Sequence, residues 1–398
     1  MLQIAFSVPS GAHHRSVLQP MRDLLAQETD WQFLIITPGA PWSDQLFPFN
    51  DYPRERFSFA ENGAADRVLA EVRPPLVVTT TAGLDPADPP ILETAKRLGL
   101  RTATVIESWD NVLKMARVNR GLGKSGQRIV LPDHLLVWNE IMKRDLLRLF
   151  PVLTRDQISI VGAPRLDYFG PRFTAQLPSK HDTLRAFDLD PSQRVLHLAT
   201  TELYDHGHVA RAIGEAKRRG DLPSDLQLYA SVHPGGNMER HRPWAEQYGF
   251  TIRFSPGRHE GAPHPDFRYN PSREEMLLLV SLFTHTDIAV NLSSTVALES
   301  CVADRPVICA FFGKPFDWLT WRRSMVVRDF REHYADLLRG GGIAVARSPR
   351  KLIELIRTYL ENPTKDREGR RRSAEIIATT LAGDASERVL HILKALVH

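Results

Sequence analysis

The stretch DIAVNLSSTVALESCVADRPVICAFF, from Asp287 to Phe312, indicates the fold of this chain. An apolar run of strand length is followed by a small polar turn, a short helical pattern and a second apolar run, which predicts a βαβ unit of a parallel sheet. The turn consists of Ser293, Ser294 and Thr295. Hydroxyl and backbone N–H groups at the amino end of a helix favour an anion such as a phosphate, although Ser and Thr are also common N-cap residues.

The same alternation of apolar strands and amphipathic helices extends through most of the 398 residues. A chain of this length fits two domains, and a proline-containing, charged segment at about 170–190 reads as the linker between them. We therefore expect two doubly wound, Rossmann-like α/β domains that face each other across a cleft, with the active site between them. The predicted boundaries are 1–175, 176–375 and a final helix at 376–398 that packs back on the first domain.

Composition places limits on the class of protein. The chain has 42% hydrophobic residues, a formal net charge of +4 and two cysteines, Cys301 and Cys309, which suggest a reducing compartment rather than a disulfide framework or a zinc site. The amino-terminal stretch reads as a core strand rather than a secretion signal, so we expect a cytoplasmic protein. The stretch from Lys114 to Arg128 has five basic residues and no acidic one. It is either a solvated loop or a peripheral contact with the inner face of a membrane; the lack of interleaved aromatic residues argues against nucleic acid.

Two turns of the first domain carry polar residues directly after predicted strands. His13 and His14 follow the first strand, where a histidine can act as a general base near neutral pH or bind an acceptor group. Trp109, Asp110 and Asn111 follow the strand TATVI. We expect Asp110 to be a candidate base and Trp109 to stack on a sugar or pack the loop, whereas the neighbouring Glu107 is expected to be structural.

In the second domain, the sequence SVHPGG at 231–236 follows another predicted strand. The proline and glycines hold His233 in a rigid turn and leave the backbone near Gly235 open to a ligand. Because the carboxyl ends of parallel strands lie at one edge of a sheet, His233 and the Ser293–Thr295 turn are expected to line the same edge. Glu299 lies four residues after Thr295 on the predicted helix, where it could accept both hydroxyls of a ribose.

Other common nucleotide-binding motifs are missing. The first turn does not contain GxGxxG, and the chain has no GxxxxGK[ST], so a dinucleotide-dependent enzyme and a P-loop kinase or ATPase are excluded.

The paired His-Pro and Ser-Ser-Thr turns with a helical Glu resemble the donor domain of bacterial GT-B enzymes that build surface carbohydrates, including CDP-glycerol glycerophosphotransferase-like proteins and capsule sialyl- and Kdo-transferases. SWDN at 108–111, VWNE at 137–140 and GAPRLDYF at 162–169 look like features of the same group. The resemblance implies that His233 contacts the donor phosphate, that Ser293, Ser294 and Thr295 contact the phosphate or diphosphate, and that Glu299 contacts the ribose. The first domain would bind the acceptor and the second the nucleotide.

One feature departs from that pattern. Many GT-B donor sites carry a loop Arg or Lys, but the loop after RVLHLATT contains Thr201, Glu202 and His206. The cation that would stabilise the leaving group is therefore unassigned, with three arginines as substitutes: Arg258, Arg268 and Arg273.

The resulting hypothesis is a metal-independent glycosyltransferase that moves a sugar from a nucleotide-activated donor to a saccharide or lipid-linked hydroxyl acceptor, without a cofactor. The expected catalytic residues are His14, Asp110 and His233. The acceptor would contact four side chains: His13, Trp109, Asn111 and Arg117. Three alternatives remain: transfer of a polyol phosphate from a CDP-activated donor, 2-epimerisation of a nucleotide sugar, and an inactive protein that only binds a nucleotide sugar.

Overall fold

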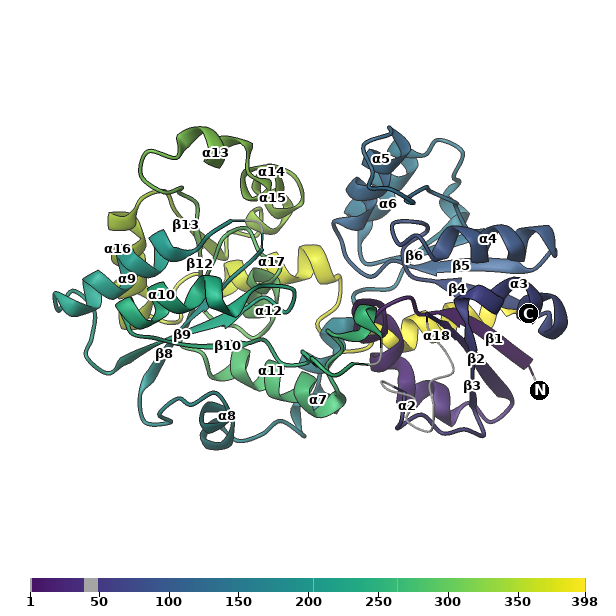
Figure 1. Cartoon of the computed structure of the whole chain (residues 1–398), viewed down its shortest axis with the longest axis horizontal. Coiled ribbons are helices and arrows are strands. Elements are labelled where there is room, and N and C mark those ends of the chain that lie inside the picture. The colour runs from purple at the N-terminus through teal and green to yellow at the C-terminus, as the bar shows by residue number, and fades with distance from the viewer. Residues whose placement is uncertain (1, 39–48, 203, 263, 398) are drawn as a thin grey trace. The chain divides into compact units, whose positions relative to one another are not determined.

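The computed structural model describes residues 2–38, 49–202, 204–262 and 264–397. The chain divides into two compact units, each described here by itself (Figure 1). Unit 1 contains Met1–Gly170, His259–Arg273 and Ala378–His398, and unit 2 contains Pro171–Arg258 and Glu274–Ile377. The chain changes unit after Gly170, Arg258, Arg273 and Ile377. The segment His259–Arg273, which lies within the sequence of unit 2 but belongs to unit 1, was not anticipated.

Unit 1 is built on a seven-stranded sheet in the order β3-β2-β1-β4-β5-β6-β7, and all neighbouring strands are parallel. Its strands are β1 Leu2–Ser7, β2 Trp31–Thr37, β3 Phe57–Glu61, β4 Leu76–Thr79, β5 Arg101–Val105, β6 His134–Val137 and β7 Ile158–Ile160. Its main helices are α1 Gly11–His13, α2 Gln19–Gln27, α3 Ala65–Val72, α4 Asp88–Arg97, α5 Asn111–Asn119, α6 Glu140–Leu149 and α18 Ala385–Val397, and a π-helical turn, His14–Leu18, joins α1 to α2.

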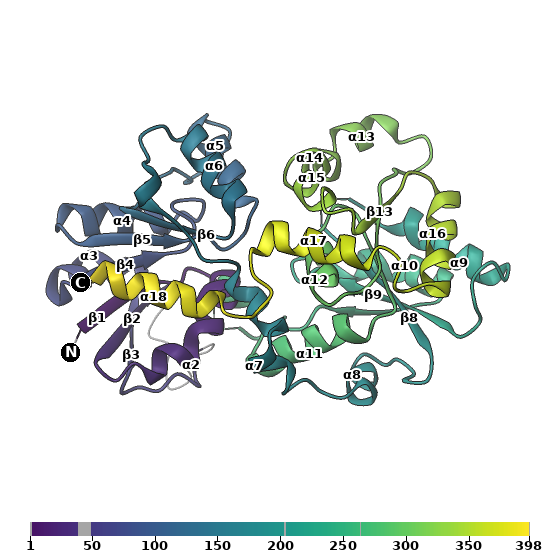
Figure 2. The same cartoon turned by 180° about the vertical axis from the view of Figure 1, so that it is seen from behind.

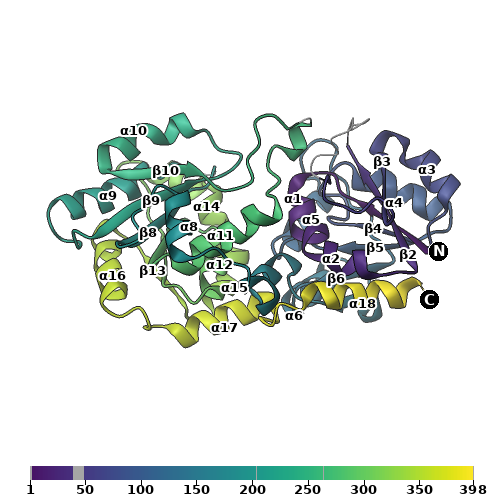
Figure 3. The same ribbon diagram turned by 90° about the horizontal axis from the view of Figure 1, so that it is seen from below.

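Successive side chains along the strands point to opposite faces of this sheet, and both faces pack against helices. Ile4 and Phe6 of β1 point to a core that includes α2 and α18, whereas Ala5 between them points to a core that includes α3 and α4. Figure 2 shows α18 running along the sheet of unit 1, and Figure 3 shows it beside α2, which it contacts. The terminal helix therefore completes one layer of unit 1.

Unit 2 is built on a six-stranded parallel sheet in the order β10-β9-β8-β11-β12-β13. Its strands are β8 Arg194–Ala199, β9 Leu226–Val232, β10 Phe250–Phe254, β11 Ile288–Asn291, β12 Val307–Ala310 and β13 Ile343–Ala346. Its helices are α7 Pro171–Thr174, α8 Lys180–Ala186, α9 Gly207–Arg218, α10 Met238–Tyr248, α11 Arg273–His285, α12 Val296–Val302, α13 Trp318–Arg323, α14 Met325–Arg331, α15 His333–Leu338, α16 Pro349–Glu361 and α17 Arg367–Ala378.

In unit 2, too, successive side chains of a strand point to opposite faces of the sheet. Leu196 and Leu198 of β8 face a core that includes α9, α10 and α16, and Val195 faces a smaller core with α8 and α11. Both sheets have the strand order of a doubly wound α/β domain, in which the order reverses beside the first strand. The predicted fold class is confirmed.

Two local expectations differ from the structure. The segment near 170–190, expected to be a linker, contains the short helices α7 and α8. The basic stretch that begins at Lys114 is not a loop at its start, because Asn111–Asn119 forms α5. Val112, Met115 and Ala116 of α5 are buried at helical spacing, so packing orders this part of the stretch.

Candidate active-site residues at the two sheet edges

The carboxyl edge of the unit 2 sheet brings together the turns that follow three neighbouring strands. Strand β8 lies between β9 and β11, so the His233 turn and the Ser293–Thr295 turn are two strand spacings, roughly 10 Å, apart across the sheet. The loop after β8 lies between them. The strand order reverses between β8 and β11, and such a reversal is where open α/β sheets bind their ligands.

The turn after β11 is held by Asn291, a residue that the sequence analysis did not identify. Its Oδ1 accepts the backbone N–H of Ser294 at 3.1 Å and the hydroxyl of Tyr334 at 3.2 Å. Ser293 adopts a left-handed backbone with φ of 51° and is buried, with its Oγ 3.9 Å from the Sγ of Cys309. Ser294 Oγ accepts the N–H of Val296. The three hydroxyls are therefore not equivalent: Ser293 packs inward, whereas Ser294 supports the start of α12.

The turn after β9 is fixed by hydrogen bonds from backbone N–H groups to side chains. Thr200 Oγ1 accepts the N–H of His233 at 3.1 Å, which ties the ends of β8 and β9 together. His233 Nδ1 in turn accepts the N–H of Gly235 at 3.2 Å, so the proton of the neutral ring lies on Nε2. The His233 side chain is 52% exposed. It places an imidazole donor at the edge of the sheet.

Arg258 stabilises this turn through hydrogen bonds to its carbonyl oxygens. Its Nη1 donates to the carbonyl oxygens of Pro234 and Gly236 at 2.6 and 3.0 Å, and its guanidinium lies 3.9 Å from the centre of the Phe254 ring. Of the three arginines considered as the missing cation, Arg258 is the one in unit 2. Arg268 and Arg273 belong to the unit 1 segment, where Arg273 pairs with Asp23 at 2.6 Å.

The loop after β8 contributes an acid rather than a cation. Glu202 Oε1 lies 3.7 Å from His233 Nδ1. His206 is fully buried, and burial lowers its pKa to about 3, so its ring is neutral at physiological pH. Glu299 lies partly buried on α12, one turn after Thr295.

The carboxyl edge of the unit 1 sheet holds a cluster of ionisable side chains around His13. This histidine follows β1 and is 5% exposed. Its Nδ1 lies 2.6 Å from Thr80 Oγ1 and 3.2 Å from Glu107 Oε2, and its Nε2 lies 3.4 Å from Asp85 Oδ2. Thr80 and Asp85 follow β4, and Glu107 follows β5. The cluster thus lies where the strand order of unit 1 reverses, between β1 and β4.

The two carboxylates determine the charge of His13. Burial by itself would lower the pKa of the imidazole, but the charge of Glu107 and the hydrogen bond and charge of Asp85 raise that pKa to about 9. The pKa of Asp85 is lowered: burial opposes this shift, and the interaction with His13 outweighs it. At neutral pH this edge therefore contains an imidazolium between carboxylates.

A third carboxylate, Asp88, organises the loop that carries Thr80 and Asp85. Asp88 is fully buried and accepts the Ser7 hydroxyl at 3.1 Å and the backbone N–H and hydroxyl of Thr81 at 3.0 and 2.5 Å. Burial raises the pKa of Asp88. These bonds join the end of β1 to the loop that carries Thr80 and Asp85, so the position of His13 relative to its partners is well defined.

His14 occupies a different environment from His13. It is 1% exposed, its Nδ1 lies 2.6 Å from Asn270 Oδ1, and its Nε2 lies 2.7 Å from the Tyr52 hydroxyl. Burial lowers its pKa to about 4. Both ring nitrogens therefore have protein partners, and the ring is neutral near pH 7. This arrangement suits a structural role in holding the 259–273 segment against unit 1.

In the loop after β5, two of the residues expected to contact the acceptor, Trp109 and Asn111, are buried. Trp109 is 5% exposed and packs against Trp138, with 5.9 Å between ring centres. Asp110 pairs with Lys114 at 2.6 Å. Asn111 is 3% exposed, and its Nδ2 has no hydrogen-bond partner among the described residues. Arg117 lies two turns further along α5 and is partly buried.

His13 was among the candidates predicted from the sequence, but the residues that contact it were not all predicted. Asp85 was not considered, and Glu107 was assigned a structural role, although both lie at strand ends on the same edge as His13. Glu107 could have been found from its position two residues after the strand RTATV, whereas Asp85 lies six residues after LVVT, within the loop that follows that strand. No group of three or more His, Cys, Asp or Glu within the described ranges is arranged to hold a metal ion.

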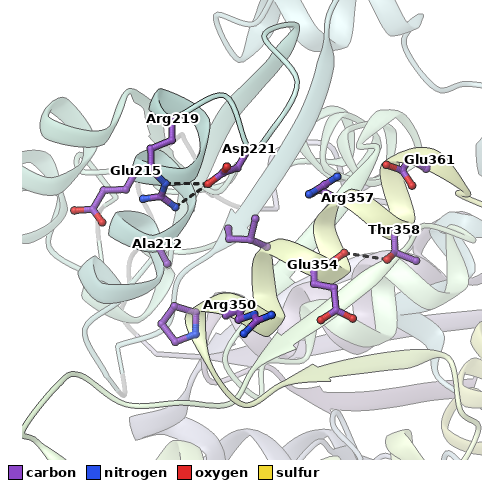
Figure 4. Close-up of a pocket in the computed structure, with 11 residues that line it drawn as sticks. Ala212, Glu215, Arg219, Asp221, Arg350, Glu354, Arg357, Thr358 and Glu361 are labelled. Carbon is purple, nitrogen blue, oxygen red and sulfur yellow. Dashed lines mark hydrogen bonds and ion pairs between the residues drawn. The ribbon is translucent and has the colours of Figure 1, made fainter.

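Two surface pockets of unit 2 lie outside these turns. Figure 4 shows one of about 800 Å³ between α9 and α16, lined by charged pairs such as Arg219 and Asp221, which are 2.9 Å apart. The other, of about 880 Å³, is lined by Trp244, Lys314 and Arg347, among others. Neither contains His233 or the Ser293–Thr295 turn. In the part of the chain that is described, no helix has both the length and the apolar character that a membrane crossing requires.

Comparison with known proteins finds solved structures of similar fold. The chain resembles a putative UDP-N-acetylglucosamine 2-epimerase from Listeria monocytogenes, with a TM-score of 0.64 and 14% identity over 99% of this chain and 96% of the other. It also resembles the wall teichoic acid polymerase TagF (TM-score 0.59, 12% identity, 99% of this chain and 88% of that chain). A glycosyltransferase from Rickettsia africae gives a TM-score of 0.58 at 12% identity, over 100% and 98% of the two chains.

No protein-family model matches the sequence, and no curated protein matches it. At these identities the similarity shows the fold, which is the GT-B type with two Rossmann-like domains.

Proposed function

We propose that this protein is an enzyme that acts on a nucleotide-activated sugar, and that it is a glycosyltransferase. Unit 2 would bind the nucleotide and its phosphates, and unit 1 would bind an acceptor, either a saccharide or a lipid-linked saccharide. The similarity to solved enzymes whose names specify UDP-N-acetylglucosamine epimerisation, wall teichoic acid polymerisation and glycosyl transfer supports the substrate class.

The observation that carries the proposal is the contrast in chemistry between the two sheet edges. The edge of unit 2 offers an imidazole donor at His233 and backbone and hydroxyl groups at 293–295, which suit a phosphate. The edge of unit 1 offers ionised carboxylates around a buried imidazolium, which suit the binding of hydroxyls and the transfer of protons. Each set lies where the strand order of its own sheet reverses.

On the donor side, we assign His233 Nε2–H to a phosphate oxygen of the leaving nucleotide. Thr295 and the backbone of the turn would contact the same group, while Ser293 and Ser294 shape the turn that presents it. Glu299 would accept the ribose hydroxyls, as the resemblance implies. A hydrogen bond from a preorganised donor to a leaving group counts most in the transition state, where the negative charge develops.

On the acceptor side, the base of an inverting transfer must remove a proton from a hydroxyl. His14 and Asp110 were the first candidates, but both ring nitrogens of His14 and the carboxylate of Asp110 have protein partners. His13 carries a proton up to a pH of about 9, so it acts as a positive charge rather than a base. Glu107 also has a partner, since its Oε2 lies 3.2 Å from His13 Nδ1, but it belongs to the cluster at the strand-order reversal of unit 1. We therefore place the base at Glu107, with His13 and Asp85 fixing its position.

The test is nucleotide release from a panel of UDP-, CDP-, GDP- and dTDP-sugars, with and without simple saccharide acceptors. Acceptor-dependent release should fall by roughly a hundredfold or more in Glu107→Gln and His233→Ala, the usual range for a lost base or oxyanion donor. Glu246→Gln, on the exposed surface of α10, is the matched control and should retain full activity. Wild-type rates in both site variants would refute the assignment.

A second candidate, 2-epimerisation of the nucleotide sugar, is favoured by the epimerase named among the similar structures. It needs no acceptor and requires that the C2–H bond break, so incubation in deuterium oxide would place deuterium at C2. Transfer of a polyol phosphate, the third reading, would move a phosphorus atom to the acceptor and is distinguished by ³¹P NMR of the product. A binding protein would show affinity for the nucleotide sugar without any product.

A further inference from the structure

The segment that follows β12 exposes an unusual group of large apolar side chains. Phe316 is 104% exposed, Trp318 65%, Leu319 47% and Met325 43%. We call these four residues the α13 patch, since they lie on or beside helix α13. Among the described residues, only two other large apolar side chains, Leu122 and Val152, are comparably exposed. Four large exposed apolar side chains within residues 316–325 exceed ordinary surface composition and indicate an interaction site.

The α13 patch is held in place rather than loosely attached. Trp321, on the inner side of α13, packs against Tyr204 and Phe311 with ring-centre distances of 5.2 and 5.3 Å. The Tyr204 hydroxyl also donates to Asp317 Oδ2 at 2.7 Å. A Cβ on Gly313 would lie 2.7 Å from the Trp321 ring, so the absence of a side chain there allows the helix to pack closely. The helix therefore packs Trp321 against unit 2 and leaves Trp318 exposed.

Positive charge accompanies the apolar side chains. Arg322 and Arg323 end α13, are exposed, and form no ion pair within the part of the chain that is described. Arg331, at the end of the neighbouring α14, is also exposed. Asp317, directly before α13, accepts a hydrogen bond from the Tyr204 hydroxyl. Figures 1 and 2 show α13 at the margin of unit 2, beside α14.

We infer that the α13 patch docks the protein on an anionic membrane surface. Phe, Trp and Leu side chains next to Arg side chains are the combination that inserts at the headgroup boundary while the charges contact acidic lipids. A second copy of the chain fits less well, because a stable homodimer needs some 20 to 30 residues a side with a core depleted in charge. The patch offers four apolar residues with arginines directly beside them.

The location of the patch gives this docking a consequence for the reaction. The loop that carries Phe316 follows β12, so it leaves the same carboxyl edge of the unit 2 sheet as the turns at His233 and Ser294. Docking through α13 would hold that edge near the membrane, where a lipid-linked substrate resides. The inference goes beyond the proposed function and does not depend on it, because membrane binding is measured without turnover.

The test is co-sedimentation of the full-length protein with vesicles of phosphatidylcholine alone and with about one third phosphatidylglycerol. The wild-type protein should bind the anionic vesicles and be released by salt. The triple variant Phe316→Ser/Trp318→Ser/Leu319→Ser should lose affinity by roughly a hundredfold, and Arg322→Gln/Arg323→Gln by about twenty-five-fold, from about fivefold per charge. Val152→Ser, which alters an equally exposed but isolated side chain, should bind as the wild type does.

Tryptophan quenching by brominated lipid locates the contact. Trp318→Phe should keep its vesicle affinity but lose most of the quenching. Thermal unfolding and nucleotide binding of each variant verify that unit 2 is intact, which separates a failure of docking from a failure of the proposed function. Equal binding by the wild type and the triple variant would overturn the inference, as would no binding by the wild type. The inference would also be overturned if the wild type did not bind vesicles but formed a dimer that is absent in the triple variant, because the patch would then bind a second copy of the chain.

Discussion

Replacing His13 with Gln tests the ionisable cluster of unit 1 through the pH dependence of stability. In the folded protein the pKa of His13 is about 9, against an ordinary value of 6.5. Because the folded state holds the proton more tightly, His13 contributes stability that is fully present below pH 6.5 and is lost as the pH rises through about 9. The full contribution is about 3 kcal/mol, and the loss between pH 7 and 9.5 is about 2 kcal/mol.

Glutamine can still hydrogen-bond to Thr80 but carries no charge. The free energy of unfolding of the wild type minus that of His13→Gln should therefore decrease by about 2 kcal/mol from pH 7 to 9.5. Taking this difference cancels the other titrating groups, such as Cys301, whose pKa is raised by burial to about 12. The control is His181→Gln, which removes a histidine that is 68% exposed and should give no pH-dependent difference.

The measurement is urea unfolding at both pH values, with unit 1 followed separately by hydrogen exchange of the β1 amides, since two units need not unfold together. NMR of ¹³C-labelled histidine provides a second readout, in which one resonance should titrate near pH 9 and disappear in the variant. A stability difference that is the same at pH 7 and pH 9.5 would refute the reasoning, because it would mean that His13 is neutral in the folded protein.

Two further substitutions test close packing at the sheet edges. Gly11→Ala should destabilise unit 1 by about 3 kcal/mol, because the new Cβ would lie 2.1 Å from the backbone oxygen of Tyr269 in the 259–273 segment. Thermal unfolding measures this loss. The control is Gly63→Ala, where nothing lies within 4 Å of the new Cβ, and it should be neutral. Arg258→Ala should weaken nucleotide binding by about tenfold, since its hydrogen bonds to two carbonyl groups of the 234–236 turn are lost; calorimetric titration measures this, and an unchanged affinity would show that the turn does not need the arginine.

The fold could be predicted because its main signals are local. Runs such as LQIAFS and RVLHLA are mainly apolar over the length of a strand, and the helices between them have a clear amphipathic period. The edge strand β3, Phe57–Glu61, and helix α3 were not identified. Only Phe57 of β3 is buried, so this short strand lacks the continuous apolar run that identified the central strands.

The sheet edge at which each candidate residue lies could be predicted, but the side chains that contact it could not. The rule that parallel strands end at one edge located His13, His233 and the Ser293–Thr295 turn. Side-chain partners depend on which loops meet, and that information is not local. Asn270 contacts His14 from 256 residues further along the chain, so a sequence pattern around His14 could not show that its nitrogens are occupied.

The most direct test of the account is calorimetric titration of the wild type and His233→Ala with UDP, CDP, GDP and dTDP. The account predicts that at least one nucleoside diphosphate binds the wild type and that its affinity falls by tenfold or more in the variant, which corresponds to about 1.4 kcal/mol or more. It also predicts that both proteins unfold at the same temperature, because the His233 side chain is half exposed. Equal affinities in the two proteins, or no binding to the wild type, would contradict the claim that the carboxyl edge of unit 2 holds the nucleotide phosphates.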